Sequence, residues 1–128
     1  MKRFPQLVLA ALILLRLISP VQAEEPSPLV QKMFQNLMNA VQAGDHAAMI
    51  LDGDETFRQG LTPAMTAGVS AQLAPRMREG YSAAFLTRMR QASYDIYLWK
   101  LTFQDGGDDF IAKVVLNQDG RVAGFLIN

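Results

Sequence analysis

Residues 93–104 read SYDIYLWKLTFQ and carry the clearest strand pattern of the chain. Side chains alternate between the two faces of a strand, so four large apolar residues of this segment share one face: Tyr97, Trp99, Leu101 and Phe103. The other face holds Ile96, Leu98, Lys100 and Thr102. Both faces are therefore more apolar than a sheet that is covered on one side requires. This segment predicts the central part of an antiparallel sheet.

Three more segments are rich in β-branched and aromatic residues, and with 93–104 they predict four strands: 83–91, 93–104, 110–117 and 121–127. The last two connections are short and contain Asp and Gly, at 105–108 and 118–120. Because short connections join antiparallel neighbours, we expect a curved four-stranded antiparallel sheet.

The residues before the sheet predict helices. Ser27 and Pro28 are typical of a helix start. Apolar residues then recur at three- and four-residue spacing up to Gly44, which ends the helix: Leu29, Val30, Met33, Phe34, Leu37, Met38 and Val41. Helices followed by strands indicate an α+β fold.

Two further helices are expected before the strands. Asp45 caps a short one that extends to Leu51, and 52–55 forms a turn. Thr62 and Pro63 open a third helix, which ends or kinks near Pro75. Residues 24–128 are predicted to be one domain.

The N-terminus predicts a secretory signal peptide at 1–23, cleaved after Ala23. Lys2 and Arg3 precede the apolar stretch 7–15, which is too short for a membrane span of about 20 residues. An uncleaved anchor over 7–18 is the alternative, although Arg16 interrupts it. We therefore expect a periplasmic or secreted protein that meets a membrane only through the transient signal peptide.

The composition narrows the function classes. The chain has 128 residues, 50% of them hydrophobic, with no cysteine, one histidine and a formal net charge of zero. Cleavage removes three basic residues and leaves nine against twelve acidic ones, a net charge near −3. We expect no cofactor, no histidine or thiolate metal site and no nucleic-acid binding. The acidic stretches at 52–55 and 105–109 do not fit the spaced calcium-loop template.

The apolar residues on the second face of the predicted sheet require another element or molecule that shields them from water. The first helix should pack on one face of the sheet, and a second subunit is our preferred cover for the other. A ligand is an alternative, and so is a set of helices that wraps both faces. We therefore expect a homodimer through the sheet.

The order of helices and strands is similar to that of the cystatin-like superfamily, which includes nuclear transport factor 2 and ketosteroid isomerase. The similarity spans the whole mature chain and rests on Phe34, Ala43-Gly44-Asp45-His46, Lys113-Val114-Val115-Leu116 and 119–125. It implies a cone-shaped cavity between helices and sheet, and frequently a dimer. Superfamily members include isomerases, dehydratases and non-catalytic binding domains, so the fold does not decide the function.

Two residues are weak catalytic candidates. Asp95 shares a strand face with Tyr97 and lies next to Tyr94, and a carboxylate with a tyrosine hydroxyl serves as base and oxyanion donor in the similar isomerases. His46 follows Asp45, but adjacent helical residues point in different directions. A solvated strand end and a helix cap are the simpler interpretations of Asp95 and His46.

Two binding surfaces are also predicted. Phe34, Tyr97, Trp99, Leu101 and Phe103 would line an apolar cavity for a small ligand. Arg88, Arg90, Lys100 and Lys113 would form one stripe for an anion or an acidic partner. The leading hypothesis is a non-catalytic periplasmic binding or interaction domain. The alternatives are a small acid–base isomerase or lyase and an accessory subunit that docks an acidic partner.

Overall fold

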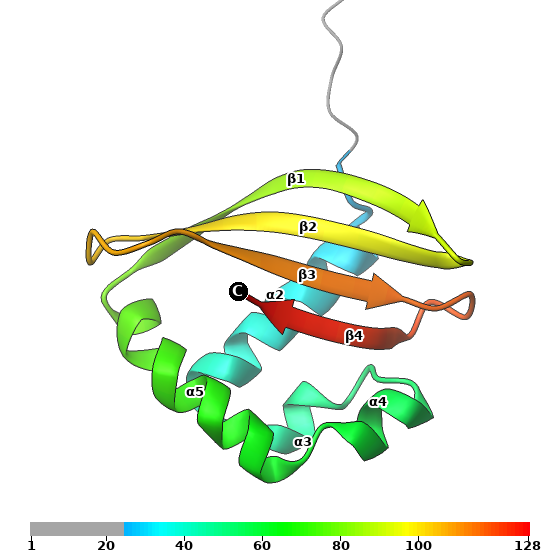
Figure 1. Ribbon diagram of the computed structural model, residues 1–128, viewed down its shortest axis with the longest axis horizontal. Coiled ribbons are helices and arrows are strands. Elements are labelled where there is room, and N and C mark those ends of the chain that lie inside the picture. The colour runs from blue at the N-terminus through cyan, green and yellow to red at the C-terminus, as the bar shows by residue number, and fades with distance from the viewer. Residues whose placement is uncertain (1–24) are drawn as a thin grey trace, which may run out of the picture.

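The computed structural model describes residues 25–128 and contains four helices followed by four strands (Figure 1). The helices are α2 (Pro28–Ala43), α3 (His46–Met49), α4 (Glu55–Gly60) and α5 (Pro63–Arg78). None of the helices in this range is long and apolar enough to cross a membrane. The predicted signal peptide and its cleavage site lie outside the described residues. The predicted α+β order of elements is confirmed.

Helix α2 follows its sequence signals closely. The Ser27 hydroxyl accepts a hydrogen bond from the Val30 amide at 3.3 Å, Pro28 is the first helical residue, and Gly44 ends the helix in the left-handed region with φ of 65°. One side of the helix is buried, through Val30, Met33, Phe34, Leu37, Met38, Ala40 and Val41. This apolar stripe forms the centre of the core.

Two helices differ from the prediction. Residues 52–55 are not only a turn, because Asp54 caps α4 by accepting a hydrogen bond from the Phe57 amide at 2.8 Å. Helix α5 runs through Pro75 to Arg78. Its C-terminal part is held by Leu73, Ala74 and Met77, which are buried, and this packing compensates for the hydrogen bond that a proline cannot donate.

The sheet is an antiparallel meander in the order β1 (Tyr81–Gln91), β2 (Tyr94–Phe103), β3 (Phe110–Leu116) and β4 (Val122–Ile127). All four helices lie on one side of it (Figure 1). We call that side the covered face and the other side the open face. Trp99 and Leu101 are buried on the covered face with Val114 of β3. The described helices therefore do not wrap both faces, which was one alternative for the second apolar face.

A β-bulge in β1 changes which residues share a face. Phe85 pairs with Trp99, but the next pair is Thr87 with Leu98, so Leu86 is the extra residue. Beyond the bulge, Arg88 pairs with Tyr97 and Arg90 with Asp95. Before the bulge, the odd-numbered residues of β1 lie on the covered face. After the bulge, the even-numbered residues lie there instead, and these include Arg88 and Arg90.

Candidate functional site

A charged cluster lies on the covered face next to the β1–β2 turn. Oδ1 of Asp95 accepts hydrogen bonds from Nη2 of Arg88 at 3.1 Å and from Nε of Arg90 at 3.4 Å. The Arg88 guanidinium also lies over the Tyr97 ring, 5.8 Å from its centroid. One carboxylate oxygen is therefore shared by two guanidinium groups.

The two arginines set the charge state of Asp95. The hydrogen bond from Arg88 is the main cause that lowers the pKa of the Asp95 carboxyl below its ordinary value, and Arg90 adds to it. A general base for chemistry near neutral pH needs a raised pKa instead. Asp95 and Tyr97 do share a face, as predicted, but the carboxylate is committed to an ion pair.

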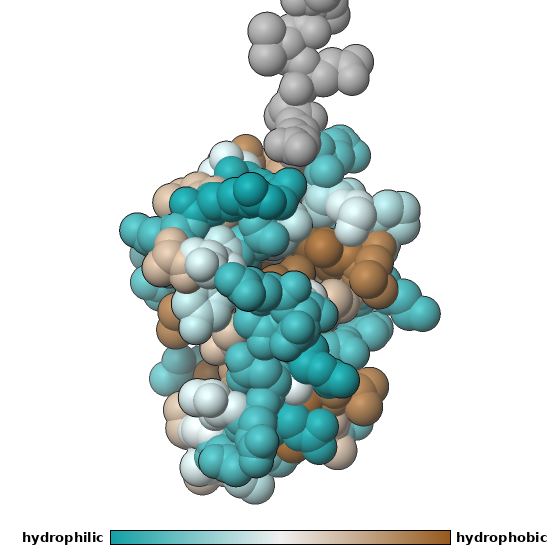
Figure 2. Space-filling model, turned by 90° about the vertical axis from the view of Figure 1, so that its right-hand side faces the viewer, coloured by the Kyte–Doolittle hydropathy of each residue, from teal (hydrophilic) through white to brown (hydrophobic). Residues whose placement is uncertain are grey.

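The turn beside this cluster is unusual. Ala92 and Ser93 both adopt the left-handed region, with φ of 52° and 70°. Two-residue hairpin turns of this kind favour Asn-Gly, because side chains with a Cβ are strained there. A hollow of about 440 Å³ surrounds the turn and is lined by Arg90, Gln91, Ala92, Ser93, Tyr94, Asp95 and Gln118. Figure 2 faces this end of the sheet, where hydrophilic surface predominates and smaller apolar patches lie between.

The predicted basic stripe is split between the two faces. Lys100 pairs with Ala84 and Ile111, and Lys113 pairs with Leu98 and Leu126, so both lysines lie on the open face. The arginines lie on the covered face. The prediction of one continuous stripe is wrong, because the bulge at Leu86 transfers the arginines to the other side of the sheet.

His46 has a structural partner. Its Nδ1 lies 2.8 Å from Oγ1 of Thr66, which is fully buried on α5. Asp45 caps α3, accepting a hydrogen bond from the Ala48 amide at 3.1 Å. The histidine therefore connects α3 to α5, and its neighbouring aspartate serves the helix start, in agreement with the simpler interpretation of this pair.

The five residues expected around an apolar cavity belong to the core. The Phe34 and Trp99 rings stack with centroids 3.9 Å apart and an interplanar angle of 6°. The other members of the set, Tyr97, Leu101 and Phe103, are buried as well. In this conformation an apolar ligand would have to displace rings that already touch each other.

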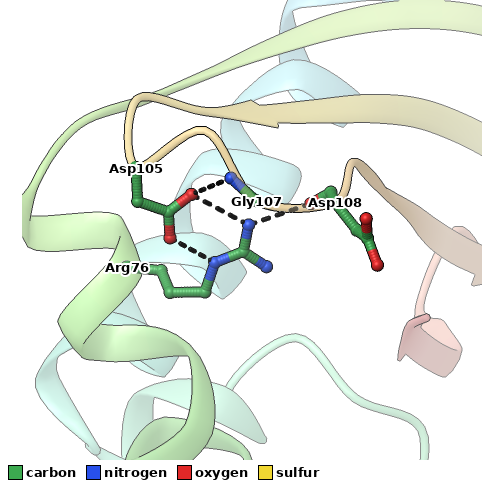
Figure 3. Close-up of polar contacts among 4 residues, drawn as sticks. All are labelled: Arg76, Asp105, Gly107 and Asp108. Atoms are coloured by element: carbon green, nitrogen blue, oxygen red, sulfur yellow. Dashed lines mark hydrogen bonds and ion pairs between the residues drawn. The ribbon is translucent and has the colours of Figure 1, made fainter.

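Sequence reasoning missed a second arginine cluster, at the opposite end of the sheet (Figure 3). Nε and Nη2 of Arg76 on α5 donate hydrogen bonds to the two carboxylate oxygens of Asp105 at 2.6 and 3.1 Å, and Nη2 also donates to the Asp108 carbonyl at 2.9 Å. The guanidinium lies 4.0 Å above the Phe103 ring centroid. Asp105 in the predicted turn was the only sequence signal, and nothing local indicated its partner.

Comparison with known proteins does not add to this picture. No protein-family model matches the sequence, and no curated protein matches it at a significant level.

Proposed function

We propose that this protein is a non-catalytic interaction domain that forms a homodimer through the open face of its sheet. One observation carries the proposal: large apolar side chains remain exposed on a face that no described helix covers. Met89 is 43% exposed and Leu126 57%. Between them in the register, Leu98 and Val115 are half-buried, Ile96 is buried, and Lys113 pairs with both Leu98 and Leu126. Exposed apolar side chains on an uncovered sheet face are typical of interaction sites.

The size of the face suits a modest dimer. Four strands about 4.8 Å apart and about seven residues long at 3.3 Å each give a face of roughly 20 by 23 Å. Each protomer would then bury about 500 Å², or about 1,000 Å² in total, which is below the usual size of a stable interface and typical of a weak one. We therefore expect a dimer that dissociates on dilution.

The arrangement of charge on this face is compatible with a second copy. Lys100 forms an ion pair with Asp109 at 3.6 Å, toward the end of the sheet away from Met89. A two-fold axis near Ile96 would place apolar residues on apolar residues and the two Lys100 side chains at opposite rims. Lys113, nearer the middle, has a stem long enough to carry its ammonium group to solvent.

Other observations support the remaining parts of the proposal. The ion-paired Asp95 and the Thr66-bound His46 favour a non-catalytic role over acid–base chemistry. The order of helices and strands is compatible with the cystatin-like superfamily, whose members are frequently dimers. Secretion to the periplasm remains a prediction from residues 1–23, and native mass spectrometry of protein recovered without refolding would read the cleavage site directly.

Sedimentation velocity over a concentration series tests the dimer. We expect the wild-type chain to shift from monomer to dimer as concentration rises, and Leu126→Lys and Met89→Lys to remain monomeric. Leu51→Lys is the matched control, because Leu51 is 64% exposed but precedes α4, on the helical side of the sheet. A wild-type monomer at about millimolar concentration would contradict the proposal, as would a dimer that Leu51→Lys weakens equally.

A further inference from the structure

Arg90 has unused hydrogen-bonding capacity. Its side chain is 81% exposed, and within residues 25–128 its one ion pair is the 3.4 Å contact of Nε with Asp95. Arg88 binds the same carboxylate oxygen from a shorter distance, 3.1 Å. A guanidinium presents its N–H groups as a rigid fork that matches a carboxylate. The terminal N–H groups of Arg90 are therefore available to donate hydrogen bonds to a second, external carboxylate.

The adjoining turn supplies the rest of a binding site. The hollow of about 440 Å³ lies within the usual size of small-ligand sites, about 300–1,000 Å³. Ser93 and Gln118 line the hollow beside Arg90, and Tyr94 borders it from the first position of β2. The left-handed backbone at Ala92 and Ser93 costs free energy, and strain of this kind is concentrated at ligand-binding positions.

We infer that the hollow at the β1–β2 turn binds a small carboxylate. The carboxylate would pair with the guanidinium of Arg90, which its pairing with Asp95 places on the covered face. In the free protein, Asp95 competes with the ligand, because its Oδ1 already accepts hydrogen bonds from Arg88 and Arg90. This site is separate from the proposed dimer and does not depend on it.

An NMR titration of ¹⁵N-labelled protein with sodium benzoate tests the inference. We expect saturable shifts of the amides of Ser93, Tyr94 and Gln118 with a dissociation constant of about millimolar order. Benzamide, which has the same ring without the charge, should give no saturable shift. Equal binding of benzamide would overturn the proposal, and so would stronger binding of inorganic phosphate than of benzoate.

Arg90→Gln should weaken benzoate binding about tenfold or more, and its exposed position makes a folding defect unexpected. Arg78→Gln on α5 removes the same charge far from the turn and should leave the affinity unchanged.

Asp95→Asn should strengthen binding several-fold, because it removes the internal competitor for Arg90. Glu79→Gln makes the same charge change elsewhere. Equal effects of Asp95→Asn and Glu79→Gln would show that net charge alone acts, and the inference would fail.

Discussion

Two arginine–aspartate clusters lie at opposite ends of the same sheet and differ in how completely they are built. At the β2–β3 turn, Arg76 binds both oxygens of Asp105, reaches the Asp108 carbonyl and stacks on Phe103, and the two charged side chains are only 21% and 20% exposed. At the β1–β2 turn, Arg90 touches Asp95 through one nitrogen at 3.4 Å.

The two arginines differ in how many of their hydrogen-bond donors are used within the protein. Arg76 uses its guanidinium fork and its flat face within the molecule, and so ties α5 to the end of the sheet. Arg90 leaves most of its donors to solvent. An arginine–aspartate pair therefore holds α5 to the sheet at one end, whereas at the other end the pair leaves guanidinium donors available to a ligand.

Removing the ring beneath Arg76 should have the largest effect on stability. Phe103 is buried against Arg76 and against the Phe110 ring, whose centroid is 5.9 Å away. We expect Phe103→Ala to reduce the free energy of unfolding by about 3–5 kcal/mol. Urea denaturation followed by circular dichroism measures it. Tyr94→Ala at the β1–β2 turn should reduce the free energy of unfolding by well under half as much. Equal losses would show that the two ends of the sheet contribute equally to stability.

Replacing the guanidinium itself should have the next largest effect. Arg76→Lys keeps the charge but loses the two-pronged bond to Asp105, so we expect a lower thermal midpoint and faster amide exchange at Gly107, whose N–H donates to Asp105 at 2.8 Å. Arg90→Lys should leave the midpoint within error of wild type. Hydrogen exchange by NMR and a thermal melt decide this together. If Arg90→Lys lowers the midpoint as much, both ends are tethers.

The sequence predicted the elements of this fold better than it predicted the site. The helix of residues 28–43 and the four strands have local causes: a Ser27 cap, three- and four-residue spacing, Gly44 and β-branched alternation. Helix α4 was missed because it is short and buries one residue, Phe57, so its stability comes from packing.

The site depended on geometry that no local pattern contains. Counting alternate residues put Arg88 and Arg90 with the lysines, and the one extra residue at Leu86 reversed that assignment. The β1–β2 turn lacks the Asn or Gly that usually marks such turns. The pairing of Arg76 with Asp105 joins residues far apart in the chain.

Acid should weaken the closed cluster in a defined range of pH. The hydrogen bond from Arg76 and the one from the Gly107 amide lower the pKa of Asp105 from 3.8 to about 2. Because the folded-state pKa is the lower one, this stabilisation is complete above 3.8 and is lost as the pH falls through about 2. The stability difference between wild type and Asp105→Asn should be constant near neutral pH and shrink over that range, as measured by denaturation at a series of pH values. A difference that does not change with pH would contradict the assignment.

Asp95→Asn should lower stability less than Asp105→Asn, with the same sign. The pKa of Asp95 is also lowered, so its ion pairs favour the folded state above its ordinary value and are lost on acidification. One carboxylate oxygen of Asp95 pairs with Arg88 at 3.1 Å and with Arg90 at 3.4 Å, and all three side chains are at least 31% exposed. Ion pairs this open to solvent contribute little. We expect the unfolding midpoint of Asp95→Asn to lie much closer to wild type than that of Asp105→Asn. A loss as large as that of Asp105→Asn would mean that Asp95 is needed to hold the turn, and a ligand carboxylate could not then take its place beside Arg90 without cost to the fold.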